Sequence, residues 1–380
     1  MGVIISRKEQ IDAYFASDDA SQSSLKKLID GLDIFLANRI ETSKLFFEEK
    51  GHFIIGSGTD CILTGEEDQF NKEYYVSEID KKPSDTIMSI VSQVFSLVLD
   101  QVDESLGETL QGYLEDNGND IEVYESAVLV AINDHNYQAN WKEETRIKKV
   151  CDEGGIYFKD LQASHGKQII SQEQYNKIYD IAMSLKTNPI TGKYFDRQMQ
   201  ARIIDMDFYY QLPIFFTYKG IKCKALLDLV AVFKDEDGKV IKIHPIDLKT
   251  MSGPTINFTS SVKSRRYDIQ GAWYTLALQH HFGQDIEILP FTFIVESTTH
   301  TGNPLIYHCN PSLLEIGKNG LSEVLLTTPE GIVHVLKRET KGYEQLLDEY
   351  IWYGQNGWEK ERIIQEKAGV LEIDWNGIMK

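Results

Sequence analysis

The chain has 380 residues, of which 42% are hydrophobic and 11% aromatic, a composition typical of a globular protein with a large core. Its 58 acidic residues outnumber 39 Lys and Arg residues, and the formal net charge of −19 argues against broad, charge-driven binding of nucleic acid. The charge leaves room for a restricted, locally basic site on an acidic body.

The positions of the cysteines and the hydropathy of the sequence exclude further classes of protein. The four cysteines stand singly and form no CxxC pair, which argues against zinc knuckles and cysteine-ligated iron–sulfur clusters. No run of about 18 apolar residues and no secretion signal is visible in the sequence. We therefore expect a cytoplasmic protein with no membrane partner.

The N-terminal half of the sequence is patterned for helices. Ser21 or Ser23 can cap a helix whose apolar positions begin at Leu25 and run to Leu36 with helical spacing. The stretch HFIIGSGTDCILTG predicts a glycine-rich turn before another helix, and residues 82–114 and 171–188 read as further helices. We expect residues 1–200 to form a helical region that contributes to the domain built by residues 201–380.

From about residue 207 the pattern becomes extended. Three strands are predicted between residues 208 and 250, with turns at 218–220 and 235–238. A helix over 265–282 and an apolar strand over 288–298 follow, and then come the strand GIVHVLK and the helix YEQLLDEYIWYGQ. This order predicts an α/β fold with a mixed central β-sheet flanked by helices.

An aspartate and a lysine interrupt the apolar strand VIKIHPIDLKT. Asp247 and Lys249 are two residues apart, so on a strand they point to the same face. Asp228 interrupts a second apolar strand, and a hairpin turning at Asp237-Gly238 would bring it beside Asp247. Neighbouring carboxylates repel each other unless a cation neutralises them, and oxygen ligands favour Mg²⁺ or Mn²⁺.

This pattern predicts a metal site with a lysine that positions a water or stabilises the charge on a phosphate. The alternative for Asp247 and Lys249 is an ordinary ion pair on a half-exposed strand. That alternative does not explain Asp228, because a carboxylate among leucines and valines needs a partner.

The next helix and the segment before it add polar residues. Gln270 and Tyr274 are four residues apart and share a helix face, from which they could orient the strand lysine or contact a DNA phosphate. They could equally be the polar edge of a packed helix. A local basic cluster precedes this helix and consists of Lys263, Arg265 and Arg266. We expect it to bind the phosphates of the DNA backbone; the alternative is an ordinary solvent-exposed loop.

These motifs resemble those of a nuclease superfamily. An aspartate followed nineteen positions later by D-L-K, and then by Q-x-x-x-Y on the next helix, resembles the PD-(D/E)xK superfamily and its RecB-like branch. The segments SQSSLKKLIDG, IIGSGTDCIL and GEEDQFNKEYYVS resemble, in that order, the exodeoxyribonuclease VIII (RecE)-type domain. Leu227 stands where the superfamily name has a proline, and the specific part of the resemblance covers residues 220–275.

The resemblance implies a restriction-endonuclease-like core and assigns roles to particular residues. Asp228 would be the first acidic ligand, Asp247 and Lys249 the signature pair, and Leu248 a member of the metal-binding set.

Two further positions depart from the family pattern. The family's histidine ligand falls on Asp60, which is also a competent ligand for Mg²⁺ but could simply cap a helix. A glutamate that usually precedes the first acidic ligand is replaced here by Gln211.

The resemblance also implies an activity and partners. It implies a Mg²⁺- or Mn²⁺-dependent exonuclease acting on linear double-stranded DNA ends in phage or bacterial recombination or repair. DNA would be the main partner, and a single-strand annealing protein and a homo-oligomer are compatible with it. Two alternatives stay open: a structure- or sequence-specific endonuclease on the same core, and an inactive nuclease-fold protein that binds DNA or assembles complexes.

Overall fold

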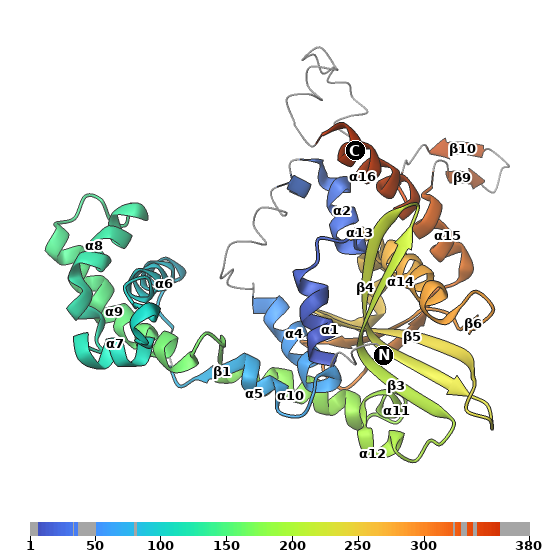
Figure 1. Cartoon of the computed structure of the whole chain (residues 1–380), viewed down its shortest axis with the longest axis horizontal. Helices are drawn as coiled ribbons and strands as arrows, with labels where there is room; N and C mark the ends of the chain where they lie inside the picture. The colour runs from blue at the N-terminus through green and yellow to red at the C-terminus, as the bar shows by residue number, and fades with distance from the viewer. Residues whose placement is uncertain are drawn as a thin grey trace, which may run out of the picture. The chain divides into compact units, whose positions relative to one another are not determined.

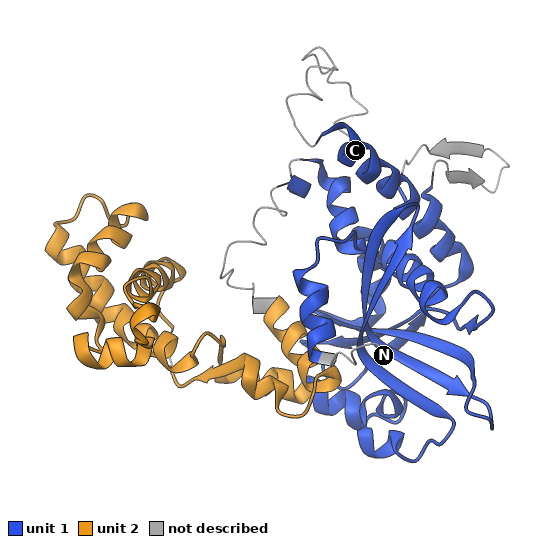
Figure 2. Ribbon diagram, in the orientation of Figure 1, with its two compact units in different colours: residues 1–50, 181–380 blue, residues 51–180 orange. Residues whose placement is uncertain are grey.

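The chain divides into two compact units. The computed structural model describes residues 7–32, 34–36, 51–79, 82–321, 324–327, 333–336 and 340–357. One unit comprises residues 1–50 and 181–380, and the other comprises residues 51–180 (Figure 2). These limits differ from the expected boundary at residue 200, because the first helices belong with the sheet: the N–H of Ala20 donates to the carbonyl of Lys222 at 3.0 Å.

The first unit is built on a six-stranded mixed sheet (Figure 1). Its order is β3-β4-β5-β7-β8, with β6 paired to β5. The β5–β7 and β5–β6 pairs are parallel and the others are antiparallel. The strands are β3 Met206–Tyr218, β4 Ile221–Lys234, β5 Val240–Met251, β6 Glu287–Ile288, β7 Thr292–Ser297 and β8 Leu305–His308. The predicted α/β fold with a mixed central sheet flanked by helices is confirmed.

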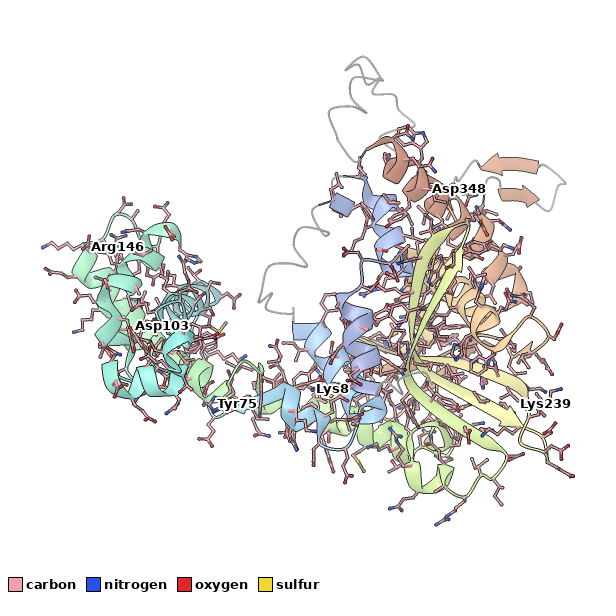
Figure 3. The ribbon with its side chains drawn as sticks, viewed as in Figure 1. Lys8, Tyr75, Asp103, Arg146, Lys239 and Asp348 are labelled. Carbon is pink, nitrogen blue, oxygen red and sulfur yellow. The ribbon has the colours of Figure 1, made fainter. Side chains whose placement is uncertain are left out.

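The two predicted turns form for identifiable reasons. Lys219 and Gly220 have φ values of 49° and 77°, as the two central residues of a tight hairpin require. In the second turn, Oδ1 of Asp235 accepts hydrogen bonds from the N–H groups of Asp237 and Lys239 at 3.1 and 2.8 Å. Figure 3 labels Lys239 at this exposed end of the β4–β5 hairpin.

Helices cover the sheet and complete one hydrophobic core. Trp273 of α14 is fully buried, and its indole Nε1 donates to the carbonyl of Lys224 on β4 at 3.0 Å. Leu25 and Leu28 of α2 enter the same core. Ser21, one of the two serines predicted as the cap, is the N-cap of this helix. The helices of this unit are α1 Arg7–Ala16, α2 Gln22–Asp30, α11 Gly192–Phe195, α12 Arg197–Gln200, η3 Thr255–Asn257, α13 Phe258–Ser264, α14 Tyr267–Phe282, α15 Pro311–Asn319 and α16 Tyr343–Asn356.

Helix α16 binds the end of the β3–β4 hairpin. Lys219 forms ion pairs with Glu344 at 2.6 Å and with Asp348 at 2.7 Å, and Figure 3 labels Asp348 on this helix. The predicted strand GIVHVLK contains β10, Val333–Leu336, which pairs antiparallel with β9, Val324–Thr327.

The second unit is mainly helical. Its core gathers apolar side chains of α6, α8 and α9, and Gly154 of α9 lies so close to Val91 of α6 that a Cβ would be 2.5 Å from it. Its elements are α4 Gly51–Thr64, α5 Gln69–Glu73, β1 Tyr74–Ser77, α6 Asp85–Leu99, η1 Glu104–Leu106, α7 Leu110–Asn117, η2 Ile121–Tyr124, α8 Glu125–Asp134, α9 Glu143–Ser164 and β2 Gln168–Ser171. Helix α10, Gln172–Thr187, crosses the limit between the units.

Two sequence-based expectations in this unit are wrong. The predicted glycine-rich turn within residues 52–65 is helical up to Thr64, because Gly58 serves close packing against Ile178 rather than a turn. The helix expected over residues 82–114 is broken between α6 and α7. There Asp103 caps a short 3₁₀ turn, and Gly107 ends it with a φ of 74°.

No helix among the described residues is both long enough and apolar enough to cross a membrane.

A glycine contact between α14 and α15 gives a test of this packing. In Gly317→Ala, the new Cβ would lie 2.0 Å from the carbonyl oxygen of Asp268, so the two helices must separate. We expect a loss of about 1–3 kcal/mol in the free energy of unfolding. The matched variant Gly155→Ala meets only an ordinary 3.5 Å contact and should gain up to about 1 kcal/mol from helix propensity. Equal changes in unfolding free energy for the two variants, measured with urea, would contradict the close approach of α15 to α14 at Gly317.

Candidate active site on strands β4 and β5

Asp247 is a buried carboxylate in the middle of the sheet. Only 1% of the residue is exposed, since residues 243–248 of β5 form a continuous buried run. Its Oδ1 accepts a hydrogen bond of 2.6 Å from Nε2 of Gln270, and its Oδ2 forms an ion pair with Lys249. These partners compensate for the cost of holding a charge away from water.

Asp228 stands beside it on the neighbouring strand. The last pair in the β4–β5 ladder is Leu229–Ile246, and the next positions along the two strands are Asp228 and Asp247. Oδ2 of Asp228 accepts a hydrogen bond of 3.1 Å from the backbone N–H of Leu248. The hairpin therefore places the two acidic groups next to each other, as its turn position predicts.

Lys249 is held in its charged form. Burial would lower the pKa of its ammonium, but the charges of Asp247 and Asp228 outweigh this effect and raise the pKa above its usual value. The ammonium also lies 5.1 Å from the ring centroid of Tyr267, a cation–π arrangement. Lys249 can therefore act as a fixed positive charge and hydrogen-bond donor at this point of the sheet.

Helix α14 aims two polar side chains at the strand pair. Gln270 and Tyr274 are 5% and 7% exposed, so neither belongs to a solvent-facing helix edge. Burial, followed by the charge of Asp247, raises the pKa of the Tyr274 phenol well above its usual value, while a hydrogen bond from Gln270 opposes the rise. Tyr274 is thus a neutral donor near the carboxylates, and the structure brings together the five residues proposed as catalytic.

The predicted basic cluster divides into two kinds of residue. The guanidinium of Arg266 binds Asp268 through Nε and Nη2, and Nη2 also donates to the carbonyl of Lys341 at 2.7 Å. Lys263 and Arg265 are exposed. Contact of this cluster with DNA stays a prediction, and Arg266 is already engaged in holding the start of α14.

Asp60 and Gln211 have different surroundings. Asp60 lies on α4 of the second unit, where its Oδ1 accepts a hydrogen bond of 3.1 Å from Oγ1 of Thr64, and its role as a ligand stays a prediction. Gln211 lies on β3 between the pairs Tyr210–Leu229 and Leu212–Leu227, opposite Asp228. Its φ of 45° is uncommon for a residue with a side chain.

The donor atoms at the strand pair fit a hard cation. The carboxylates of Asp228 and Asp247 and the main-chain carbonyl of Leu248 are all oxygen donors. No group of three or more His, Cys, Asp or Glu side chains that could hold a metal occurs in the part of the chain that the structure describes. Two carboxylates suit Mg²⁺, which commonly keeps several waters and takes its other ligands from substrate phosphates.

Two site residues were missed by sequence reasoning. Tyr267 and Lys26 lie beside Lys249, with the Lys26 ammonium 5.9 Å from the Tyr267 ring centroid. Tyr267 follows the basic cluster directly, so its position at the start of α14 was a usable signal. Lys26 is more than two hundred residues away in sequence, and nothing in its local pattern distinguishes it from Lys27.

The sequence matches no protein-family model, and no curated protein is similar to it at a significant level. One similar solved structure is the crystal structure of a protein from Eubacterium rectale, described as a proposed exonuclease, with 14% identity and a TM-score of 0.38. The match covers 83% of this chain and 81% of that one. Any functional assignment therefore depends on the residues of the site.

The hydrogen bond from Gln270 to Asp247 can be tested through stability. Gln270→Ala removes a donor from a buried carboxylate and should lower the free energy of unfolding by about 1.5–3 kcal/mol. Gln279→Ala, on the same helix and only half-buried, should change it by less than about 0.5 kcal/mol. Urea unfolding of both variants measures the difference. Similar losses of unfolding free energy in the two variants would mean that the hydrogen bond to Asp247 does not stabilise the folded protein.

Proposed function

We propose that this chain is a metal-dependent deoxyribonuclease that hydrolyses phosphodiester bonds, acting as an exonuclease on the ends of linear double-stranded DNA. The observation that carries the proposal is the buried carboxylate of Asp247, held between Gln270 and Lys249 and adjacent to Asp228. A structural ion pair would not require a second carboxylate at the neighbouring position of β4. The D…D-L-K and Q-x-x-x-Y resemblance supports the same reading.

Each residue has a role that its surroundings permit. Gln270 donates to one oxygen of Asp247 and so fixes the orientation of that carboxylate. Lys249, charged and partly exposed, can donate to a non-bridging oxygen of the scissile phosphate and stabilise the charge that grows there. Tyr274, neutral and next to Gln270, can donate a hydrogen bond but does not supply a base.

Asp228, Asp247 and the carbonyl of Leu248 would hold Mg²⁺ or Mn²⁺. When bound, such an ion supplies a polarised water as nucleophile and neutralises charge on the phosphate. The protein's own contribution is to hold both carboxylates in a fixed orientation before DNA arrives.

The remaining expectations are proposals of the same kind. Preference for ends over internal sites follows from the RecE-type resemblance, as do the pairing with a single-strand annealing protein and a homo-oligomer. An endonuclease and an inactive DNA-binding protein are the rivals, and both are separated by the experiment below.

The direct test is digestion of matched linear and covalently closed duplex DNA with Mg²⁺, with Mn²⁺ and with EDTA. We expect metal-dependent loss of the linear form alone. Asp247→Asn should lower the rate by about 10²-fold or more, because it removes the charge of a proposed metal ligand while keeping the shape of the side chain. Asp237→Asn, an equal charge change on the exposed β4–β5 turn, should cleave like the wild type.

The alternative outcomes are distinct. Cleavage of both DNA forms would indicate the endonuclease, and DNA binding without cleavage would indicate the inactive protein. A folded Asp247→Asn variant with full activity would contradict the site assignment itself.

A further inference from the structure

Lys26 is placed beside the candidate active site by the packing of α2. Ser21 caps this helix by accepting a hydrogen bond of 3.2 Å from the N–H of Ser24. Leu25 and Leu28, on either side of Lys26, are 0% and 6% exposed in the core of the sheet unit, which sets the rotation of the helix. Helix α2 contacts both α14 and α16. The direction of Lys26 is therefore determined by buried neighbours rather than by solvent.

The ammonium of Lys26 reaches the start of α14. Its Nζ donates to the carbonyl of Arg265 at 3.3 Å and lies 5.9 Å from the ring centroid of Tyr267. The ammonium of Lys249 lies 5.1 Å from the centroid of the same ring. Two positive charges, one from the first helices of the chain and one from β5, thus share a single aromatic neighbour next to Asp247.

The ammonium of Lys26 has no carboxylate of its own among the described residues. It forms no ion pair there. The charges of Asp247 and Asp268 act on Lys26, but Asp247 is already paired with Lys249 and Asp268 with Arg266. Lys26 is half-buried, and an ammonium has three N–H donors, of which the Arg265 carbonyl takes one. Burial lowers the pKa of Lys26 to about 8, and the charge of Lys249 adds to this effect. A partly buried charge of this kind lowers the stability of the folded protein unless an anion offsets the cost of its desolvation.

We propose that Lys26 binds an oxygen of a DNA backbone phosphate next to the scissile bond, so that α2 supplies a second cation to the site. This inference rests on the proposed nuclease function and extends it to a residue outside the D…D-L-K and Q-x-x-x-Y motifs. A compact ammonium is suited to phosphate as a point charge, and its spare N–H donors allow it to bind while Arg265 holds it in place. Lys249 would then serve the scissile phosphate and Lys26 a neighbouring one.

The test is the salt dependence of DNA binding by the full-length chain. A fluorescent linear duplex is titrated in Ca²⁺ over a range of KCl concentrations, with gels to verify that the DNA stays intact. Lys26→Gln removes the charge but keeps an amide that can donate to the Arg265 carbonyl. We expect its affinity to fall about tenfold and the slope of log K against log salt to become shallower by about 0.9, the effect of one lost phosphate contact. Lys27→Gln, the same charge change one residue along, should keep the wild-type slope.

A measurement on the wild-type protein covers the case in which Lys26→Gln does not fold. Amine acetylation at pH 8, read by mass spectrometry with and without duplex DNA, should show Lys26 protected by DNA several-fold more than Lys27. Equal protection of the two lysines, or equal salt slopes for the two variants, would overturn the role of Lys26 while cleavage by the wild type still supports the nuclease. A wild-type protein that neither binds nor cleaves DNA would overturn both proposals.

Discussion

The site depends on a single buried charge. Asp247 is almost completely removed from solvent, and its two oxygens are matched by an amide donor from α14 and an ammonium from its own strand. Removing a carboxylate from water costs several kcal/mol unless such partners are present. The hydrogen bond from Gln270 and the protonation of Lys249 both meet that requirement. An apolar residue at 247 would pair in the sheet equally well, so the sheet itself does not require this charge.

The topology explains how separate parts of the chain reach this charge. Strand β5 is central, pairing with β4, β6 and β7, so a residue in its middle can be approached only from above or below the sheet. Helix α14 crosses that space and is held there by the buried Trp273. Helix α2 then packs against α14, while residues 51–180 form a separate compact unit between these two parts of the sequence. The sheet unit is thus discontinuous in sequence, and Lys26 shares it with Lys249.

Local patterns were good predictors where a short-range rule decides the structure. The alternation of β3, β4 and β5, the turn at Lys219-Gly220 and the cap at Ser21 each depend on a few neighbouring residues. The placement of Asp228 beside Asp247 followed from one turn, because antiparallel register is fixed once the turn is known. Glycine was a less reliable predictor: Gly58 suggested a turn, but it is a helical residue against which Ile178 packs. Its role depends on a partner more than a hundred residues away.

The sequence by itself therefore determined the mixed α/β class, the strand hairpins and the acidic pair with its lysine, since each is a matter of period, turn residues and spacing. Only the tertiary structure decided how deeply Asp247 is buried and that Gln270 donates to its Oδ1. It also decided that Arg266 is paired with Asp268 and that Lys26 lies near Lys249. These facts depend on the packing of helices onto a sheet, in which contacts join residues far apart in the chain. A local sequence pattern does not predict such contacts, because the neighbouring residues of each side chain are the same whether or not the distant contact forms.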